Sequence, residues 1–174
     1  MRTNATGRWT SAAVMVTALA GMTCASPSAY ASFDRVAING VFTAASDGQF
    51  ATSDYSFHAE ESVTSRWTIS STCTSDVECT GEVSSDQGWK APLHMRMGNV
   101  WSVDRDVPNW QVCPDGTAFT GHQTFSFSPS DEHGVTKIGS PYLEGRDKTV
   151  GALGACGRFK ALVIVMPFRL DKVE

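Results

Sequence analysis

Two cysteines separated by five residues, Cys73 and Cys79, are the first side chains of this sequence that could do chemistry. They lie between two runs in which apolar and polar residues alternate. A zinc site would need further Cys or His at ligand spacing, and a redox pair would have the spacing C-x-x-C; neither pattern is present. Directly opposed residues of antiparallel strands lie about 4.5–5.5 Å apart, a distance that a disulfide can span. The pair therefore predicts a disulfide across a β-hairpin.

Histidine is the side chain most often used for proton transfer, and the chain has four. They are His58, His94, His122 and His133. None belongs to an H-x-H, H-E-x-x-H or H-x-x-E-H pattern, and strand alternation places His94 and His122 on outward faces. The sequence also has no G-x-S-x-G or S-x-x-K motif, no Walker A sequence and no dinucleotide fingerprint. It therefore predicts no catalytic residue, no cofactor and no metal site, in a protein that is not an enzyme.

Two groups of charged residues have ordinary local explanations. Asp131, Glu132 and His133 bring three titratable groups into one loop; a weak cation site and a polar turn both fit, and the following glycine favours the turn. Asp104 and Asp106 flank Arg105, and we expect a local ion pair there.

Aromatic residues crowd the middle of the chain. Four tryptophans lie within residues 67–110, and three phenylalanines follow at 119–127. Most should fill the core of a small β-domain. Trp89 and Trp110 lie in turn-rich segments, so we expect them to be partly exposed. These two are the candidate contacts for a carbohydrate, lipid or protein partner.

The N-terminus has the layout of a secretory signal peptide. Two arginines precede an apolar run at residues 12–20, and AYA at 29–31 forms a small-residue cleavage site. The run is about half of the ~20 residues that a membrane span needs, so we predict no stable membrane anchor. The alternative is a lipoprotein cleaved before Cys24, but Gly21 stands where a lipobox has an aliphatic residue.

We therefore predict a signal peptide at residues 1–31 and one secreted domain at 32–174, a monomer that is free or associated with the cell wall. Without the signal the net charge falls from −4 to −6, with 12 basic and 18 acidic residues. An acidic chain without runs of Lys or Arg argues against a nucleic-acid partner. Four cysteines remain, and an even number of cysteines in an exported protein predicts that they form disulfides. If Cys73 joins Cys79, then Cys113 and Cys156 form the second disulfide.

Hydrophobic residues recur with a period of two along most of this domain, which predicts β-strands separated by turn sequences. Clear examples are VTSRWTISSTC (63–73), LHMRM (93–97) and AFTGHQTFSFS (118–128). Residues 139–157 are glycine-rich and predict a long loop with one short strand near Tyr142. Residues 159–170 predict a last strand, buried on nearly both faces, with Pro167 near its end. We expect a single antiparallel all-β domain of seven or eight strands, a barrel-like meander, with a two-sheet β-sandwich as the alternative.

Several segments resemble a group of small exported proteins of mycobacteria. They are SDGQFATSD, SRWTISSTC, CTGEVSSDQGWKAPL, RDVPNWQVCPDGTA and GACGRFKALVIVMPFRL. The resemblance extends from about Val41 to Leu170 and includes a Trp-strand-Cys hairpin, a CPDGT turn and a GACG segment before the last strand. It implies export from an actinobacterium and a β-fold with two disulfides. The group has no established activity, so it supplies no catalytic residues.

Three functions compete on these grounds. The leading hypothesis is a non-enzymatic domain, secreted or held in the cell envelope, that binds a ligand or partner. The second is a carrier with an apolar ligand inside a β-barrel, and the third is a hydrolase whose site lacks a recognisable motif. A void of a few hundred Å³ inside the barrel would favour the carrier, whereas a solid core would favour a surface interaction module.

Overall fold

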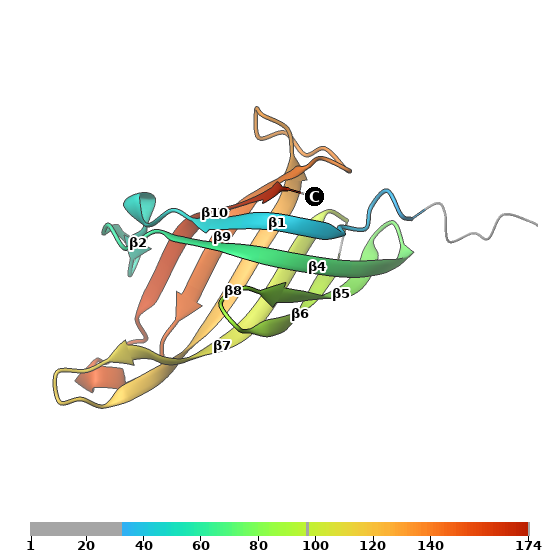
Figure 1. Ribbon diagram of the computed structural model, residues 1–174. Coiled ribbons are helices and arrows are strands. Elements are labelled where there is room, and N and C mark those ends of the chain that lie inside the picture. Colours follow the sequence, from blue (N-terminus) through green and yellow to red (C-terminus); the bar gives the residue numbers. More distant parts are fainter. Residues whose placement is uncertain (1–32, 97, 174) are drawn as a thin grey trace, which may run out of the picture.

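The chain folds into a closed antiparallel β-barrel. The structure is a computed structural model that describes residues 33–96 and 98–173 (Figure 1). Each long strand pairs with the next along the chain, and the last pairs with the first, which closes the barrel. The strands are β1 (Gly40–Ser46), β4 (Val63–Ser75), β5 (Glu78–Ser85), β6 (Lys90–Arg96), β7 (Val100–Val112), β8 (Ala118–Ser130), β9 (Tyr142–Val150) and β10 (Val163–Lys172). The predicted barrel-like meander is confirmed, and the sandwich alternative is wrong.

Smaller elements lie between the long strands. A hairpin of β2 (Thr52–Ser53) and β3 (Ser56–Phe57) adds to the edge of β10. The helical elements in the described part of the chain are two 3₁₀ turns, η2 (Gly48–Phe50) and η3 (Ala155–Gly157). No helix among these residues has the length and apolar character of a membrane span. The predicted signal peptide, its cleavage site, Cys24 and Met97 lie outside the described residues.

Alternation along the strands sorts side chains between the interior and the outer surface. On β4, Trp67 and Ile69 are buried, while the intervening Thr68 and the following Ser70 are exposed. On β6 the buried residues also alternate with exposed ones. Apolar side chains that alternate in this way pack against one another when the sheet curls and closes. The periodicity seen in the sequence therefore becomes the barrel interior.

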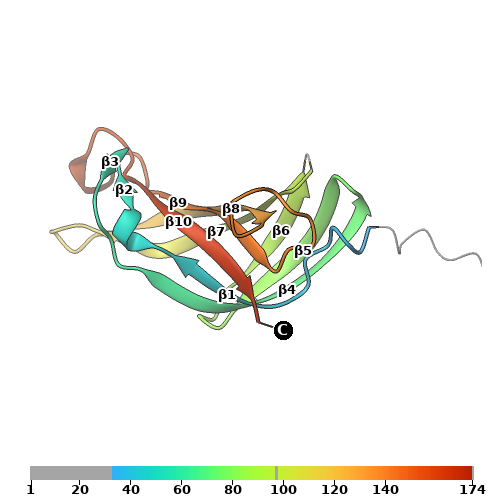
Figure 2. The ribbon, with the colours of Figure 1, turned by 90° about the horizontal axis from the view of Figure 1, so that it is seen from above.

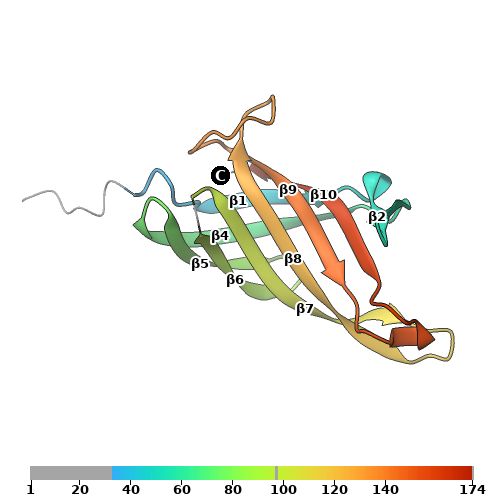
Figure 3. The same cartoon turned by 180° about the vertical axis from the view of Figure 1, so that it is seen from behind.

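Residues 139–157 form more regular structure than the sequence predicts. The nine residues of β9 pair along their whole length with β8 and with β10 (Figure 3). The expectation of a long loop with one short strand is wrong. The alternation of apolar and polar residues in β9 could not be recognised from the sequence, because two of its inward positions hold Gly145 and Asp147, which are not apolar side chains. A Cβ at Gly145 would lie 1.9 Å from the carbonyl oxygen of Ser126. Glycine here permits close approach of β9 to β8.

Two expectations for the last strand also need correction. β10 is not buried on both faces: Phe168 and Leu170 point inward and are buried, while Arg169 is exposed. Pro167 lies in the middle of the strand, where its carbonyl oxygen accepts a hydrogen bond from the Asp47 N–H at 2.9 Å. Asp47 directly follows Ser46, the last residue of β1 that pairs with β10. The Pro167 nitrogen, which has no hydrogen to donate, therefore faces the end of β1, and no hydrogen bond of the sheet is lost.

Both predicted disulfides are present. Cys73–Cys79 joins directly opposed residues of β4 and β5, with 4.0 Å between the Cα atoms. Cys113–Cys156 joins the turn after β7 to η3. The second bridge ties the loop at residues 151–162 to the β7–β8 hairpin. Each disulfide stands at a different end of the barrel.

Candidate ligand-binding site

The two ends of the barrel interior differ in how they are filled. At one end, here called the filled end, the inward side chains are 0% to 2% exposed and form a continuous core. They are Phe42, Ile69, Cys79, Leu93, Met95, Trp101, Val103, Phe127, Leu143 and Leu170. The opposite end, the open end, contains a cavity of about 430 Å³. The β2–β3 hairpin and the loop with η3 lie beside this open end (Figure 2).

Aromatic rings separate the cavity from the filled end. Trp67 on β4 packs edge-to-face against Phe125 on β8, with 4.9 Å between ring centroids. Phe168 on β10 lies 5.2 Å from Trp67 and 4.9 Å from Phe125 by the same measure. Such ring contacts are rigid and bury large apolar areas. They give the cavity an apolar floor.

A buried carboxylate stands in the wall of this cavity. Asp147 on β9 is 2% exposed, and both of its oxygens accept hydrogen bonds from the Gln123 side-chain amide, at 2.8 and 2.9 Å. The hydroxyl of Ser46 also donates to it, at 2.8 Å. Burial raises the pKa of Asp147 above its usual value, although the hydrogen bonds from Gln123 and Ser46 and the charge of Arg105 oppose this shift.

Arg105 on β7 completes the polar network. Its Nε donates to the Gln123 side-chain oxygen at 2.7 Å, so Gln123 links the guanidinium to the carboxylate of Asp147. The guanidinium also lies over the Trp89 ring, with 4.2 Å from Cζ to the ring centroid, a cation–π contact. Burial lowers the pKa of Arg105, and the charge of Asp147 opposes the shift. The side chain stays positively charged.

The expected ion pair of Arg105 with its sequence neighbours is wrong. Arg105 points into the barrel, as alternation with the inward Val103 and Val107 requires. Asp104 and Asp106 point outward instead. The carboxylate of Asp106 lies 3.0 Å from Nδ1 of His122 on β8. Adjacent residues of a strand face opposite sides, and this was the signal that could have identified Arg105 as an interior residue.

The two candidate tryptophans both line the cavity and are half-buried. Trp89 lies in the turn between β5 and β6 and packs against Trp67, 5.3 Å away between ring centroids. Trp110 lies within an irregular segment of β7, between Val107 and Gln111, at which the pairing with β8 shifts register. Its ring lies against Gly121, where an added Cβ would come within 2.7 Å of the indole. Sequence reasoning missed the residues between them, Arg105, Gln123 and Asp147.

None of the four histidines, all of which the structure describes, lines the cavity. His122 is on the outer surface, His58 pairs with Glu60 at 3.1 Å, and the exposed His133 lies 3.6 Å from Glu132. His94 also faces outward, on a surface that it shares with Ser102 and Asp104. Among these described side chains no hydrogen bond links His94 to either neighbour, so the group lacks the arrangement that activates a serine.

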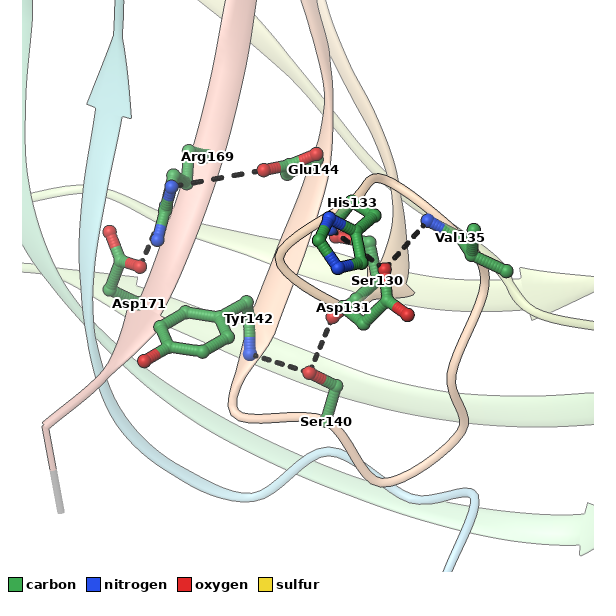
Figure 4. A network of polar contacts seen from close by, with 9 residues as sticks. All are labelled: Ser130, Asp131, His133, Val135, Ser140, Tyr142, Glu144, Arg169 and Asp171. Atoms are coloured by element: carbon green, nitrogen blue, oxygen red, sulfur yellow. Dashed lines mark hydrogen bonds and ion pairs between the residues drawn. The ribbon is translucent and has the colours of Figure 1, made fainter.

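The loop after β8 is a polar turn, one of the two readings of the Asp131-Glu132-His133 sequence. The Asp131 side chain accepts hydrogen bonds from the backbone N–H groups of His133 and Val135, at 2.9 and 3.0 Å (Figure 4). The Ser140 hydroxyl donates to the carbonyl oxygen of Ser130. Among residues 33–96 and 98–173, no three His, Cys, Asp or Glu side chains are placed to hold a metal ion.

Comparison with known proteins shows a likeness in fold. No protein-family model and no curated protein matches the chain. Among solved structures, the chain is similar to the monomer form of the M. tuberculosis PknI sensor domain, with a TM-score of 0.52. The two are 15% identical, and the match covers 79% of this chain and 88% of that one. At this identity the likeness concerns the fold alone.

Proposed function

We propose that this protein is a secreted, non-enzymatic binding domain that takes a ligand into the open end of its barrel. The cavity of about 430 Å³ carries this proposal, because ligand sites in proteins are typically concave, largely apolar and of this size. The two disulfides support export, since such bridges persist mainly in oxidising compartments. Similarity to a sensor domain in fold is compatible with a binding role.

The side chains in the cavity favour binding over catalysis. Its polar network joins a guanidinium, an amide and a carboxylate, on Arg105, Gln123 and Asp147, and the buried hydroxyls of Ser46 and Thr149 also line the cavity. The Ser46 hydroxyl donates to the carboxylate of Asp147 at 2.8 Å, but no His or Lys of the described chain lines the cavity to complete the arrangement that activates a serine. The carboxylate of Asp147 is 2% exposed and its two oxygens already accept hydrogen bonds, which makes it a poor general base. The hydrolase hypothesis is therefore the weakest of the three.

The cavity itself favours the carrier hypothesis over a solid interaction module. A purely apolar ligand would nevertheless leave the buried polar network facing hydrocarbon, which is costly. We propose a ligand that has both apolar and polar parts. Trp89 and Trp110 would contact it as flat, rigid walls near the opening.

Titration of the protein with Nile red, a neutral fluorescent dye, tests this site. We expect saturable binding with one dye per chain and a blue shift of its emission. Trp110→Ala should weaken binding severalfold, because it removes one wall of the cavity. Tyr142→Ala removes an exposed aromatic ring that does not line the cavity and is the matched control. Absence of saturable binding to the folded wild-type protein would contradict the proposed function.

Export is tested separately on protein recovered from the culture filtrate of a producing host. We propose cleavage after Ala31, so mass analysis should find Ser32 at the mature N-terminus. A lipid-modified Cys24 at the N-terminus would contradict this and replace the secreted form with an anchored one. Size-exclusion chromatography with light scattering should give a monomer.

A further inference from the structure

We propose that the cavity binds an amphipathic ligand through a single anionic group, such as a carboxylate, which pairs with the guanidinium of Arg105. The inference rests on the proposed function, because it assigns the chemical class of the ligand to the same cavity. It is carried by the hydrogen-bonding capacity that the described residues leave unused.

Arg105 has donors to spare inside the cavity. Its guanidinium carries five N–H groups, and the structure uses one of them, on Nε, for Gln123. Among the described residues no acceptor reaches the two terminal amino groups, Nη1 and Nη2, although the side chain is half-buried. Two parallel N–H groups of this kind match the geometry of a carboxylate, phosphate or sulfate.

The guanidinium is also held in place before any ligand arrives. The Trp89 ring supports one face, and Gln123 fixes Nε from the side. Gln123 cannot turn its amide around without loss, because its NH₂ group is bonded to Asp147. A donor group fixed in this way loses little conformational entropy when it binds, which favours affinity.

The polar network around Arg105 offers much less to a cationic group. The buried acceptor is the carboxylate of Asp147, which is 2% exposed and already receives hydrogen bonds from Gln123 and Ser46. Arg105 would also repel a positive group at this depth. Within the network of Arg105, Gln123 and Asp147, the unused hydrogen-bonding groups are therefore the Arg105 donors, and a ligand that reaches them must bring the acceptors.

The remaining lining limits the ligand to one charged group. The floor is formed by the rings of Trp67, Phe125 and Phe168, which suit an apolar segment. Glu60 and Glu61 also belong to the lining, and their negative charges oppose a second anionic group on the ligand. A monocarboxylate with an uncharged apolar body fits this lining, whereas a polyanion does not.

Three probes with the same chain length separate this inference from the proposed function. Calorimetric titrations would use decanoate, decanol and decyltrimethylammonium, each below its critical micelle concentration. We expect decanoate to bind about 10-fold to 100-fold more tightly than decanol, as a charge-assisted pair would give, and the cation to bind most weakly. If decanol or the cation binds as tightly as decanoate, the inference is overturned while the cavity remains a binding site. If none of the three binds, the proposed function itself fails.

Variants of Arg105 locate the effect. Arg105→Gln should bring decanoate affinity down to that of decanol, and Arg105→Lys should restore part of the preference, because lysine keeps the charge but lacks the planar fork. Arg146→Gln is the matched control, since Arg146 is exposed on the outward face of β9 next to Asp147. The ratio of decanoate to decanol affinity is the readout, because loss of stability alone does not change it. A full preference in folded Arg105→Gln would overturn the inference; if that variant does not fold, the Lys variant and the wild-type ratio decide.

Discussion

The filled end and the open end of this barrel are built from the same strands by the same alternation, yet their inward side chains differ in chemistry. On β7 the inward residues run from Trp101 and Val103 at the filled end to Arg105 and Val107 at the open end. On β8 the phenylalanines give way to Gln123 and Gly121. One end therefore supplies apolar burial, and the other supplies a cavity with a charged network.

The difference also has an energetic side. Apolar packing at the filled end stabilises the fold in proportion to the area removed from water. Burial of Asp147 and Arg105 at the open end costs desolvation that their hydrogen bonds only partly offset, as the directions of both pKa shifts show. A fold that retains such groups in a cavity departs from the best-packed solution, and departures of this kind concentrate at functional sites. The filled end thus supplies apolar stabilisation, and the open end holds the proposed binding site.

The largest expected contrast comes from truncating a side chain at each end. Trp101→Ala at the filled end should lower the free energy of unfolding by about 3–5 kcal/mol, because the side chain is fully buried in a sealed core. Met166→Ala in the cavity wall should cost only about 1 kcal/mol, because that side chain is already half-exposed. Urea unfolding measures both. Equal losses would show that the two ends are packed alike.

The disulfides sharpen the same comparison. Cys113→Ser breaks a bridge with a sequence separation of 43 at the open end, and the chain-entropy relation gives about 4 kcal/mol. Cys73→Ser breaks a bridge with a separation of 6 at the filled end, for about 2 kcal/mol. Thermal unfolding should therefore show the lower midpoint for Cys113→Ser. A lower midpoint for Cys73→Ser would mean that the open end depends little on its bridge.

A smaller effect should follow from filling the space beside Trp110. Gly121→Ala places a Cβ 2.7 Å from the indole ring, so the ring must move, at a cost of about 1–3 kcal/mol. Nile red binding should change with it, because Trp110 lines the cavity. Thr120→Ala, at an exposed outward position of the same strand, should change stability by at most about 0.5 kcal/mol. If Gly121→Ala leaves both stability and dye binding unchanged, the ring is not fixed by this contact.

The smallest expected effect is a pH dependence of opposite sign at two carboxylates. The folded state raises the pKa of Asp147, so its contribution to stability is greatest below its unfolded pKa and is lost as the pH rises through the raised value. Hydrogen bonds from the side chain and backbone of Thr117 lower the pKa of Asp115, so its contribution is lost as the pH falls. Relative to wild type, Asp147→Asn should therefore be least favourable at low pH and Asp115→Asn at neutral pH. Denaturant titrations across this range measure both, and parallel curves for the two variants would contradict the assignment.

Local sequence patterns were enough for much of the filled end. The alternation in residues 63–73 identified a strand with Trp67 and Ile69 inward, as observed. The spacing of Cys73 and Cys79 across a turn identified their bridge, because opposed residues of a hairpin are close by geometry alone. The sequence predicted only a short strand near Tyr142, and the full length of β9 was missed because Gly145 and Asp147 occupy inward positions that carry no apolar signal.

The amino-acid sequence by itself determined most of the strands, the disulfide pairing and the class of fold, since each depends on a period of two, a short spacing or a count of cysteines. Only the tertiary structure decided the site. Ser46 and Asp147 are separated by 101 positions, yet their side chains are 2.8 Å apart because β10 pairs with both β1 and β9 and brings their ends together. Hydrogen bonds form only within a few tenths of an ångström of their preferred length, and strand register and barrel closure set such distances.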